Sequence, residues 1–123
     1  MNSKNITVLI PLHNLSNNFS EWFGKCVKSI EQAKDKPGQI IFICPKTDEF
    51  EKFFSSWECP KGLNHSRIYN ETKTDFCSQI NLGVESVESE YFSILEHDDE
   101  YSNIWFNQFT EYVGHYPDVD IFF

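Results

Sequence analysis

Apolar residues recur along this chain in two alternating patterns. Short, nearly continuous apolar runs are typical of strands in a parallel sheet that is covered on both faces. Between these runs, apolar residues spaced three and four positions apart indicate amphipathic helices. The predicted strands cover residues 6–12, 39–44, 66–70 and 119–123, together with the run that begins at Tyr91.

Four helices are predicted between the strands. Their expected starts are Ser20, a position near Asp48, Thr74 or Asp75, and Ser102. The residues expected to face the core are Trp22, Phe23, Cys26, Val27, Ile30 and Ala33 in the first helix, Phe50, Phe53, Phe54 and Trp57 in the second, Phe76, Cys77, Ile80, Val84 and Val87 in the third, and Trp105, Phe109, Tyr112 and Val113 in the fourth. Gly83 lowers the helix propensity of the third helix by about 1 kcal/mol, so we expect it to permit close packing on the sheet.

The strict alternation of strands and helices predicts one α/β domain over residues 1–123. With right-handed crossovers, it forms a Rossmann-like, open and mostly parallel sheet flanked by helices. Ligands of such sheets bind outside the carboxyl ends of the strands, where the strand order reverses. The loops expected at that edge are residues 13–14, 44–47, 70–74 and 96–100.

One of these loops, residues 96–100, reads Glu-His-Asp-Asp-Glu. Four carboxylates at a strand end repel one another, and a bound cation relieves that repulsion. Carboxylate oxygens at this spacing suit Mg²⁺ or Mn²⁺. The alternative is a solvated acidic turn that ends the strand and precedes a helix. The expected position at the ligand-binding edge favours the metal.

The composition limits which kinds of partner the chain is expected to bind and in which cellular compartment it is expected to reside. The formal net charge of −9 argues against broad electrostatic binding to nucleic acid. The four cysteines form no C-x-x-C pair, which favours reduced thiols in a cytoplasmic protein, with disulfides as the alternative. No run approaches the ~18 apolar residues of a membrane span, and no secretory signal is recognised, so no transmembrane segment is expected.

Four segments, in this order, resemble motifs of family 2 glycosyltransferases with the GT-A fold. Residues 6–14 resemble the opening strand of that family, which ends in Pro, one residue, an aromatic residue and Asn. Residues 79–83 are similar to its Ala-Arg-Asn-x-Gly helix segment, and residues 93–101 lie where it carries its metal-binding Asp-x-Asp motif. Trp105 and residues 117–121 also match in kind and spacing.

The resemblance implies a transferase that uses a nucleoside-diphosphate sugar as donor and a glycan, lipid or protein as acceptor. Pro11, His13 and Asn14 would border the nucleotide, and Asn81 would support the sugar-nucleotide pocket. Cys44 is also expected among the residues that bind the nucleotide sugar, because it begins a Cys-Pro-Lys-Thr segment where the family usually has Asp-Asp-Gly-Ser, whose first Asp meets the nucleobase.

The resemblance also implies a bound metal ion, Mn²⁺ or Mg²⁺, that assists departure of the diphosphate. Asp98 would be the principal ligand and Asp99 an assisting one, while Glu96 would reach the ribose or the metal. His97 is interpreted as an ordinary loop histidine.

Three functions remain open at this stage. The first is a metal-dependent glycosyltransferase, or the donor-binding half of one, because in the family the acceptor-binding half and the catalytic base follow the fifth strand. The second function is a non-catalytic module that binds a nucleotide sugar. The third is a structural or assembly subunit that offers a sheet edge to a partner.

Overall fold

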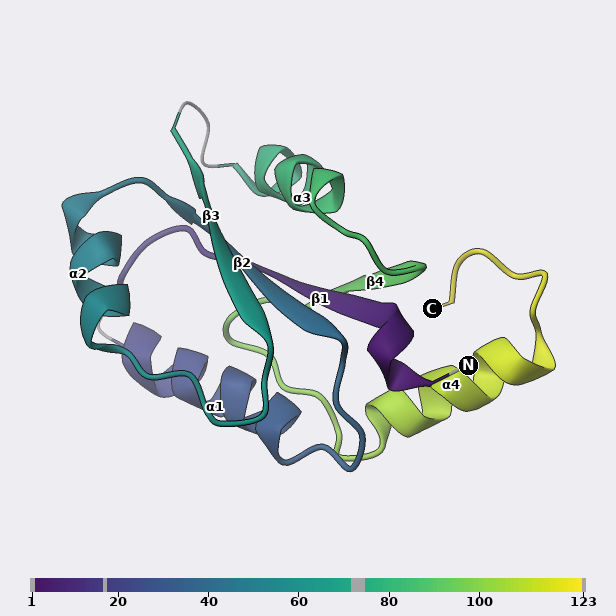
Figure 1. Ribbon diagram of the computed structural model, residues 1–123. Helices are drawn as coiled ribbons and strands as arrows, with labels where there is room; N and C mark the ends of the chain where they lie inside the picture. The colour runs from purple at the N-terminus through teal and green to yellow at the C-terminus, as the bar shows by residue number, and fades with distance from the viewer. Residues whose placement is uncertain (1, 17, 72–74, 123) are drawn as a thin grey trace.

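The computed structural model of the chain describes residues 2–16, 18–71 and 75–122. At its centre lies a four-stranded sheet in which all neighbouring strands are parallel (Figure 1). In their order across the sheet, the strands are β3 (His65–Asn70), β2 (Gln39–Pro45), β1 (Ile6–Pro11) and β4 (Tyr91–Ile94). The predicted open, parallel α/β sheet is therefore confirmed.

Helices cover both faces of this sheet (Figure 1). The helices on one face are α1 (Phe19–Glu31), α2 (Asp48–Ser56) and α4 (Trp105–His115), and α3 (Phe76–Glu85) covers the other. A 3-10 turn, η1 (Ser3–Asn5), precedes β1 and packs against α4. In the described part of the chain, no helix combines the length and apolar character needed to cross a membrane.

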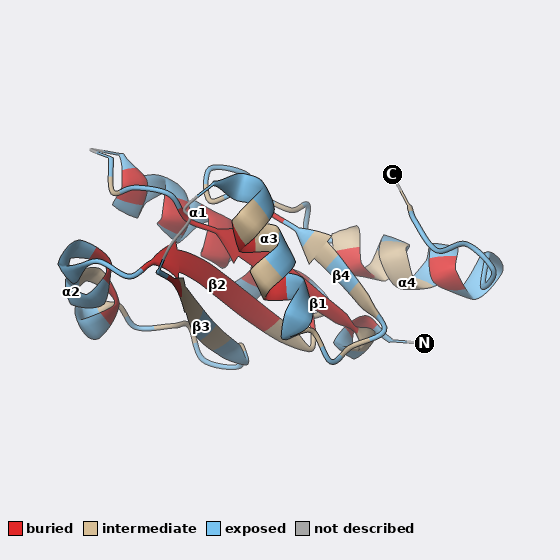
Figure 2. Cartoon of the chain, turned by 90° about the horizontal axis from the view of Figure 1, so that it is seen from above, coloured by how far each residue is buried: buried red, intermediate tan, exposed pale blue. Residues whose placement is uncertain are grey.

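The core follows the apolar runs of the two central strands. All of β1 and nearly all of β2 are buried, whereas β3 and β4 alternate between covered and exposed positions (Figure 2). The larger core faces α1 and contains the fully buried rings of Phe19, Phe23, Phe42 and Phe106. Burial on both faces explains why the central strands show no alternation in the sequence.

Two helices begin where capping chemistry predicts. The hydroxyl of Thr47 accepts a hydrogen bond from the Phe50 amide, and this bond starts α2 beside the predicted Asp48. The Asp75 carboxylate accepts one from the amide of Ser78 and starts α3. Thr74, the alternative start, lies outside the described residues.

The other two predicted caps are wrong. Helix α1 begins one residue before Ser20, and α4 begins three residues after Ser102, so neither hydroxyl occupies an N-cap. The actual N-cap positions, Asn18 and Ile104, make no side-chain capping bond. Both helices bury aromatic residues, Phe19 and Phe23 in α1 and Phe106 in α4, and packing of such a face supplies most of the stability of helices in proteins.

Several residues predicted to face the core are exposed instead. They are Trp22 (39%), Phe76 (38%), Cys77, Val84 (37%) and Tyr112 (55%). In α3 the buried positions are Gln79 and Gly83, and in α4 they are Phe106 and Val113. Aromatic and aliphatic residues occur on more than one side of these helices, so spacing alone did not identify the face that packs on the sheet.

The predicted close packing at Gly83 is confirmed. A Cβ atom on this residue would lie 3.0 Å from Cδ1 of Ile43 and 3.3 Å from Cδ2 of Leu9. Both of those side chains are fully buried in β2 and β1. The missing side chain therefore lets α3 approach the sheet.

The predicted fifth strand is absent from residues 119–122, and Phe123 lies outside the described residues. The amide of Val119 donates to the carbonyl of Tyr116 in a turn, and Ile121 is 67% exposed. The ring of Phe122 packs 6.1 Å from that of Phe109 on α4. This segment has the composition of a strand, but within the described residues no strand pairs with it.

Candidate functional site

The strand order reverses between β1 and β4. From β1 the chain adds β2 and β3 on one side and then returns to place β4 on the other. Leu9 of β1 is in register with Ile94 of β4, and the Leu95 amide donates to the Leu9 carbonyl at 2.9 Å. The loops after these two strands therefore leave the same edge as neighbours, which is where ligands of open parallel sheets bind.

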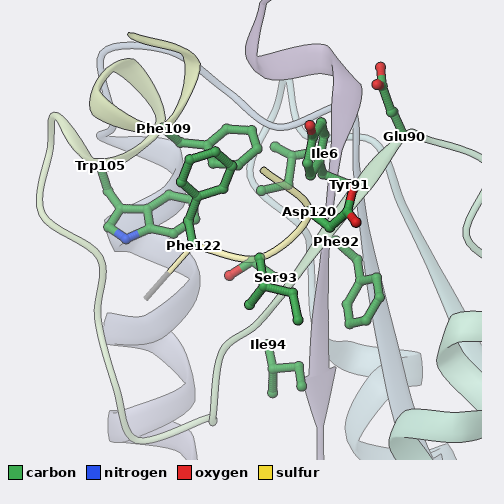
Figure 3. A pocket seen from close by; sticks show the side chains of 11 residues that line it. Ile6, Glu90, Tyr91, Phe92, Ser93, Ile94, Trp105, Phe109, Asp120 and Phe122 are labelled. Atoms are coloured by element: carbon green, nitrogen blue, oxygen red, sulfur yellow. The ribbon is translucent and has the colours of Figure 1, made fainter. Parts of the chain in front are cut away.

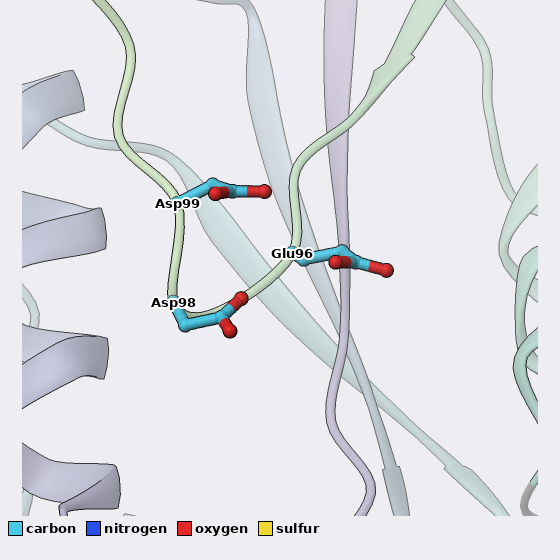
Figure 4. A group of neighbouring side chains, drawn as sticks. All are labelled: Glu96, Asp98 and Asp99. Carbon is cyan, nitrogen blue, oxygen red and sulfur yellow. The ribbon is translucent and has the colours of Figure 1, made fainter.

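The loop after β4 brings three carboxylates together. One ligand oxygen from each of Glu96, Asp98 and Asp99 lies within 4.8 Å of the other two, and all three residues are exposed. Figure 4 shows the three side chains leaving the loop toward the same side. A turn in which the Asp99 amide donates to the Glu96 carbonyl at 3.0 Å produces this convergence.

Hydrogen bonds anchor the acidic loop to the body of the domain. The Cys26 thiol of α1 donates to the Glu96 carbonyl at 3.7 Å. Farther along the loop, the amide of Tyr101 donates to the hydroxyl of Ser29, also in α1, at 3.1 Å. The Tyr101 hydroxyl lies 2.7 Å from that of Ser93 in β4. These contacts fix the loop to both a helix and a strand.

Two buried groups beneath the acidic loop, Cys26 and Tyr101, have raised pKa values. Burial, and then the negative charges of Asp99, Glu100 and Asp98, raise the pKa of Cys26 to about 12. The thiol therefore stays protonated at neutral pH and can donate to the loop. Burial also raises the pKa of the Tyr101 hydroxyl above its usual range, so it too remains neutral.

His97 packs against aromatic rings of α1. Its ring centroid lies 5.3 Å from that of Phe19 and 6.3 Å from that of Trp22, both on α1. The half-buried imidazole thus fastens the loop to the helix. This position agrees with its interpretation as a loop histidine.

The loop after β1 begins at a tightly held residue. Leu12 donates its amide to the Ile43 carbonyl at 2.8 Å, and its own carbonyl accepts from Nε2 of Gln79 at 2.6 Å. His13 and Asn14 follow and are exposed beside the acidic loop, whereas Pro11 is buried at the end of β1. Of the residues predicted to border the nucleotide, His13 and Asn14 are therefore open to solvent.

Cys44 and Asn81 lie differently. Cys44 is fully buried in the core on the α1 side, and burial raises the pKa of its thiol to about 11. Asn81 is exposed on α3. It is two residues, or about 200°, from Gln79 around the helix, so it points away from the strand ends. The structure does not bring these two side chains to the acidic loop, and their binding roles stay predictions.

The sequence interpretation missed Gln79. This residue is fully buried and reaches the ends of three strands. Its Nε2 donates to Leu12 after β1 and lies 3.5 Å from the Ile43 carbonyl of β2 and 3.4 Å from Oδ1 of Asn70 in β3. Its spacing of four residues from Gly83, on one helix face, was the available signal.

The donor set at the acidic loop fits a hard divalent cation. Three carboxylates within 4.8 Å supply oxygen ligands, and their exposure leaves room for water or phosphate oxygens. Mg²⁺ is usually held in this manner, by few carboxylates plus water and substrate phosphate. Glu96, Asp98 and Asp99 are the described residues that could hold it.

Comparison with known proteins identifies the fold. No protein-family model matches the chain, and no curated protein matches its sequence. The structure is similar to a crystal structure of S. aureus TarS 1–349, with a TM-score of 0.67, 11% identity and 91% of this chain covered. A second S. aureus TarS structure matches with a TM-score of 0.67, 12% identity and the same coverage of this chain.

This similarity supports a GT-A-like fold for the chain. The chain spans only a part of each matched structure, 33% of the first and 20% of the second.

Proposed function

We propose that this chain is the donor-binding part of a metal-dependent glycosyltransferase and binds a nucleoside-diphosphate sugar at the switch point between β1 and β4. One observation carries the proposal: three carboxylates converge at the edge of the sheet where this topology binds ligands. The glycosyltransferase-like fold and the motif resemblance support it independently.

In this proposal the residues of the chain have separate tasks. Asp98 and Asp99 hold Mn²⁺ or Mg²⁺, and Glu96 contacts the same ion or the ribose. His13 and Asn14 border the nucleotide from the neighbouring loop. A divalent ion bound here supplies Lewis-acid stabilisation of the negative charge on the departing diphosphate. The anchored loop supplies positioning, because its contacts to α1 and β4 hold the carboxylates in place before the donor arrives.

A non-catalytic nucleotide-sugar-binding module is the second candidate. The observation that favours it is the buried, neutral Cys44 thiol at the second strand, where the family usually presents a carboxylate to the base. A thiol in the core does not accept a hydrogen bond from a nucleobase as a carboxylate does. Donor binding without turnover would distinguish this module from a transferase.

Thermal unfolding with and without ligands tests the proposal. The melting temperature is measured with EDTA, with millimolar Mn²⁺, and with Mn²⁺ plus UDP, GDP, ADP or dTDP. We expect Mn²⁺ alone to raise it, since the ion relieves carboxylate repulsion, and one nucleotide to raise it further. A ligand at 100 times its Kd adds about 2.7 kcal/mol to the free energy of unfolding.

The outcomes separate the candidates. Stabilisation by one nucleoside diphosphate that requires Mn²⁺ supports the donor site, and release of nucleoside diphosphate from the matching sugar donor then supports a transferase over a binding module. Identical melting temperatures under all conditions would contradict donor binding altogether.

A further inference from the structure

Helix α3 brings one amide side chain to the ends of three strands. Gln79 is fully buried, and its Nε2 donates to the Leu12 carbonyl at 2.6 Å. The same atom lies 3.5 Å from the Ile43 carbonyl and 3.4 Å from Oδ1 of Asn70. Gly83, about one turn later on the same helix face, permits this approach because it places no side chain between α3 and the sheet.

The hydrogen bond to Leu12 acts on the loop that leads to the proposed nucleotide site. Leu12 also donates its amide to the Ile43 carbonyl at 2.8 Å, so both backbone polar groups of this residue are held. The peptide bond between Leu12 and His13 is trans, so a fixed Leu12 carbonyl also fixes the direction of the His13 amide. The positions of His13 and Asn14, which border the nucleotide in the proposed function, therefore depend on Gln79.

Stability alone does not explain an amide at this position. Oε1 of Gln79 and Nδ2 of Asn70 are buried, and among the described residues neither atom has a hydrogen-bond partner. A buried polar atom without a partner lowers stability, whereas leucine would fill a similar volume with no polar atom to satisfy. What leucine cannot supply is a donor for the Leu12 carbonyl. The amide is therefore suited to positioning the loop after β1.

The acidic loop has anchors of its own. Two of its hydrogen bonds go to the Cys26 thiol and the Ser29 hydroxyl of α1, on the face of the sheet opposite α3. Within the described part of the chain, the Gln79 side chain makes no hydrogen bond to residues 96–100. The loop after β1 and the acidic loop, which together form the proposed donor site, are thus supported from different helices.

We propose, on the basis of the proposed donor site, that Gln79 is a positioning residue for the nucleotide and not for the metal. It orders the loop after β1, and the acidic loop keeps its shape without it. Loss of the amide therefore weakens nucleotide binding and leaves Mn²⁺ binding unchanged. A general loss of stability would instead weaken both.

Two variants remove the donor, and a third serves as the stability control. Gln79→Met keeps the length and flexibility of the side chain without its N–H groups, and Gln79→Leu removes them with a branched side chain. Phe109→Leu is the control, since the ring of Phe109 lies 5.3 Å from that of Tyr91 at the start of β4, the end of this strand far from the acidic loop (Figure 3). This variant lowers stability by trimming an aromatic contact and leaves both loops of the proposed site intact.

Two-dimensional NMR of the ¹⁵N-labelled chain, without any ligand, reports on the loops directly. We expect the amide signals of His13 and Asn14 to shift and broaden in both Gln79 variants, because the Leu12 carbonyl loses its donor. The amide signals of residues 96–100 should stay as in the wild type, and the control variant should leave both sets unchanged. Unchanged signals of His13 and Asn14, or loss of the fold in both Gln79 variants, would overturn the proposal.

Isothermal titration measures the consequence for binding. Mn²⁺ alone should bind the wild type and all three variants with the same affinity. Among UDP, GDP, ADP and dTDP, titrated in the presence of Mn²⁺, the nucleotide that binds the wild type should bind the control equally and the Gln79 variants about 10-fold more weakly.

The outcomes of the titration separate positioning from general destabilisation. An equal loss of Mn²⁺ and nucleotide affinity in the Gln79 variants, or a matching loss in Phe109→Leu, would overturn the proposal. Absence of nucleotide binding by the wild type would contradict the donor site itself. The NMR comparison needs no ligand, so it still decides in that case whether Gln79 orders the loop after β1.

Discussion

Replacing Gly83 with alanine tests how closely α3 packs on the sheet. The new methyl carbon would lie 3.0 Å from Cδ1 and 3.3 Å from Cγ1 of Ile43, and 3.3 Å from Cδ2 of Leu9. These separations are shorter than the 3.5–4.0 Å at which carbon atoms attract one another best. Both neighbouring side chains are fully buried in the central strands, so neither moves without disturbing its own contacts.

Two opposing contributions determine how Gly83→Ala changes the free energy of unfolding. Overpacking of a well-filled core destabilises by about 1–3 kcal/mol. Alanine in place of glycine in a helix interior stabilises by about 1 kcal/mol. The net expectation for Gly83→Ala is a loss of about 0–2 kcal/mol in the free energy of unfolding.

Gly24→Ala in α1 is the matched control. A Cβ atom at Gly24 would meet no other atom within 4 Å, so only the helix term remains. We expect this variant to gain about 0.5–1 kcal/mol. Gly83→Ala should thus be the less stable of the two by about 1–3 kcal/mol.

Urea denaturation followed by tryptophan fluorescence measures the difference between these two variants. The slope of the free energy against urea concentration should stay unchanged, which shows that the midpoints report stability alone. If Gly83→Ala proves as stable as Gly24→Ala, α3 does not lie as close to the sheet as described, and the position of Gln79 is then also in question.

Three further predictions concern the buried amide of Gln79, the buried thiol of Cys26 and the partly covered imidazole of His65. Gln79→Leu should lower the free energy of unfolding by about 1–3 kcal/mol, because the Leu12 carbonyl loses its partner; urea denaturation measures the loss, and unchanged stability would contradict it. The pKa of Cys26 in the folded chain is about 12, above its ordinary value of 9.0. The contribution of this thiol to the free energy of unfolding should therefore be fully present below pH 9 and decrease as the pH rises toward 12. Melting curves of Cys26→Ala should show a smaller loss of stability over this pH range. Burial, and then the charge of Arg67, lower the pKa of His65. The contribution of this imidazole to the free energy of unfolding should therefore be fully present above pH 6.5 and decrease as the pH falls through the folded pKa. If His65→Gln loses stability on acidification as the wild type does, His65 is not the cause of the loss.

The sequence was most informative where burial is continuous. Strands β1 and β2 lie in the middle of the sheet, and their unbroken apolar runs correctly predicted a parallel α/β fold. The alternation of strands and helices also correctly placed the acidic loop at the same edge as His13 and Asn14. Local patterns were sufficient here because the topology of alternating α/β chains permits few arrangements.

Two features of the structure depend on tertiary contacts that local sequence patterns do not reveal. Val119 and Ile121 have strand-forming side chains, but a strand also needs a hydrogen-bonding neighbour, and none pairs with this segment within the described residues. Gln79 is polar, so hydrophobic periodicity excluded it from the inner face of α3, yet three strand ends offer it hydrogen-bond acceptors. Periodicity identifies the apolar side of a helix but cannot reveal a buried amide with partners elsewhere in the sequence.

Isothermal titration of nucleoside diphosphate and Mn²⁺ into the wild type, Asp98→Asn and Asp118→Asn tests the proposed donor site most directly. Asp98 lies in the acidic cluster, whereas Asp118 is exposed after α4, so both variants lose one negative charge but only one loses a candidate ligand. We predict that Asp98→Asn keeps its fold and binds the nucleotide about 10-fold to 100-fold more weakly, or by about 1.4–2.8 kcal/mol. Asp118→Asn should bind as the wild type does. Equal affinity in all three proteins, or no metal-dependent binding by the wild type, would contradict the donor site.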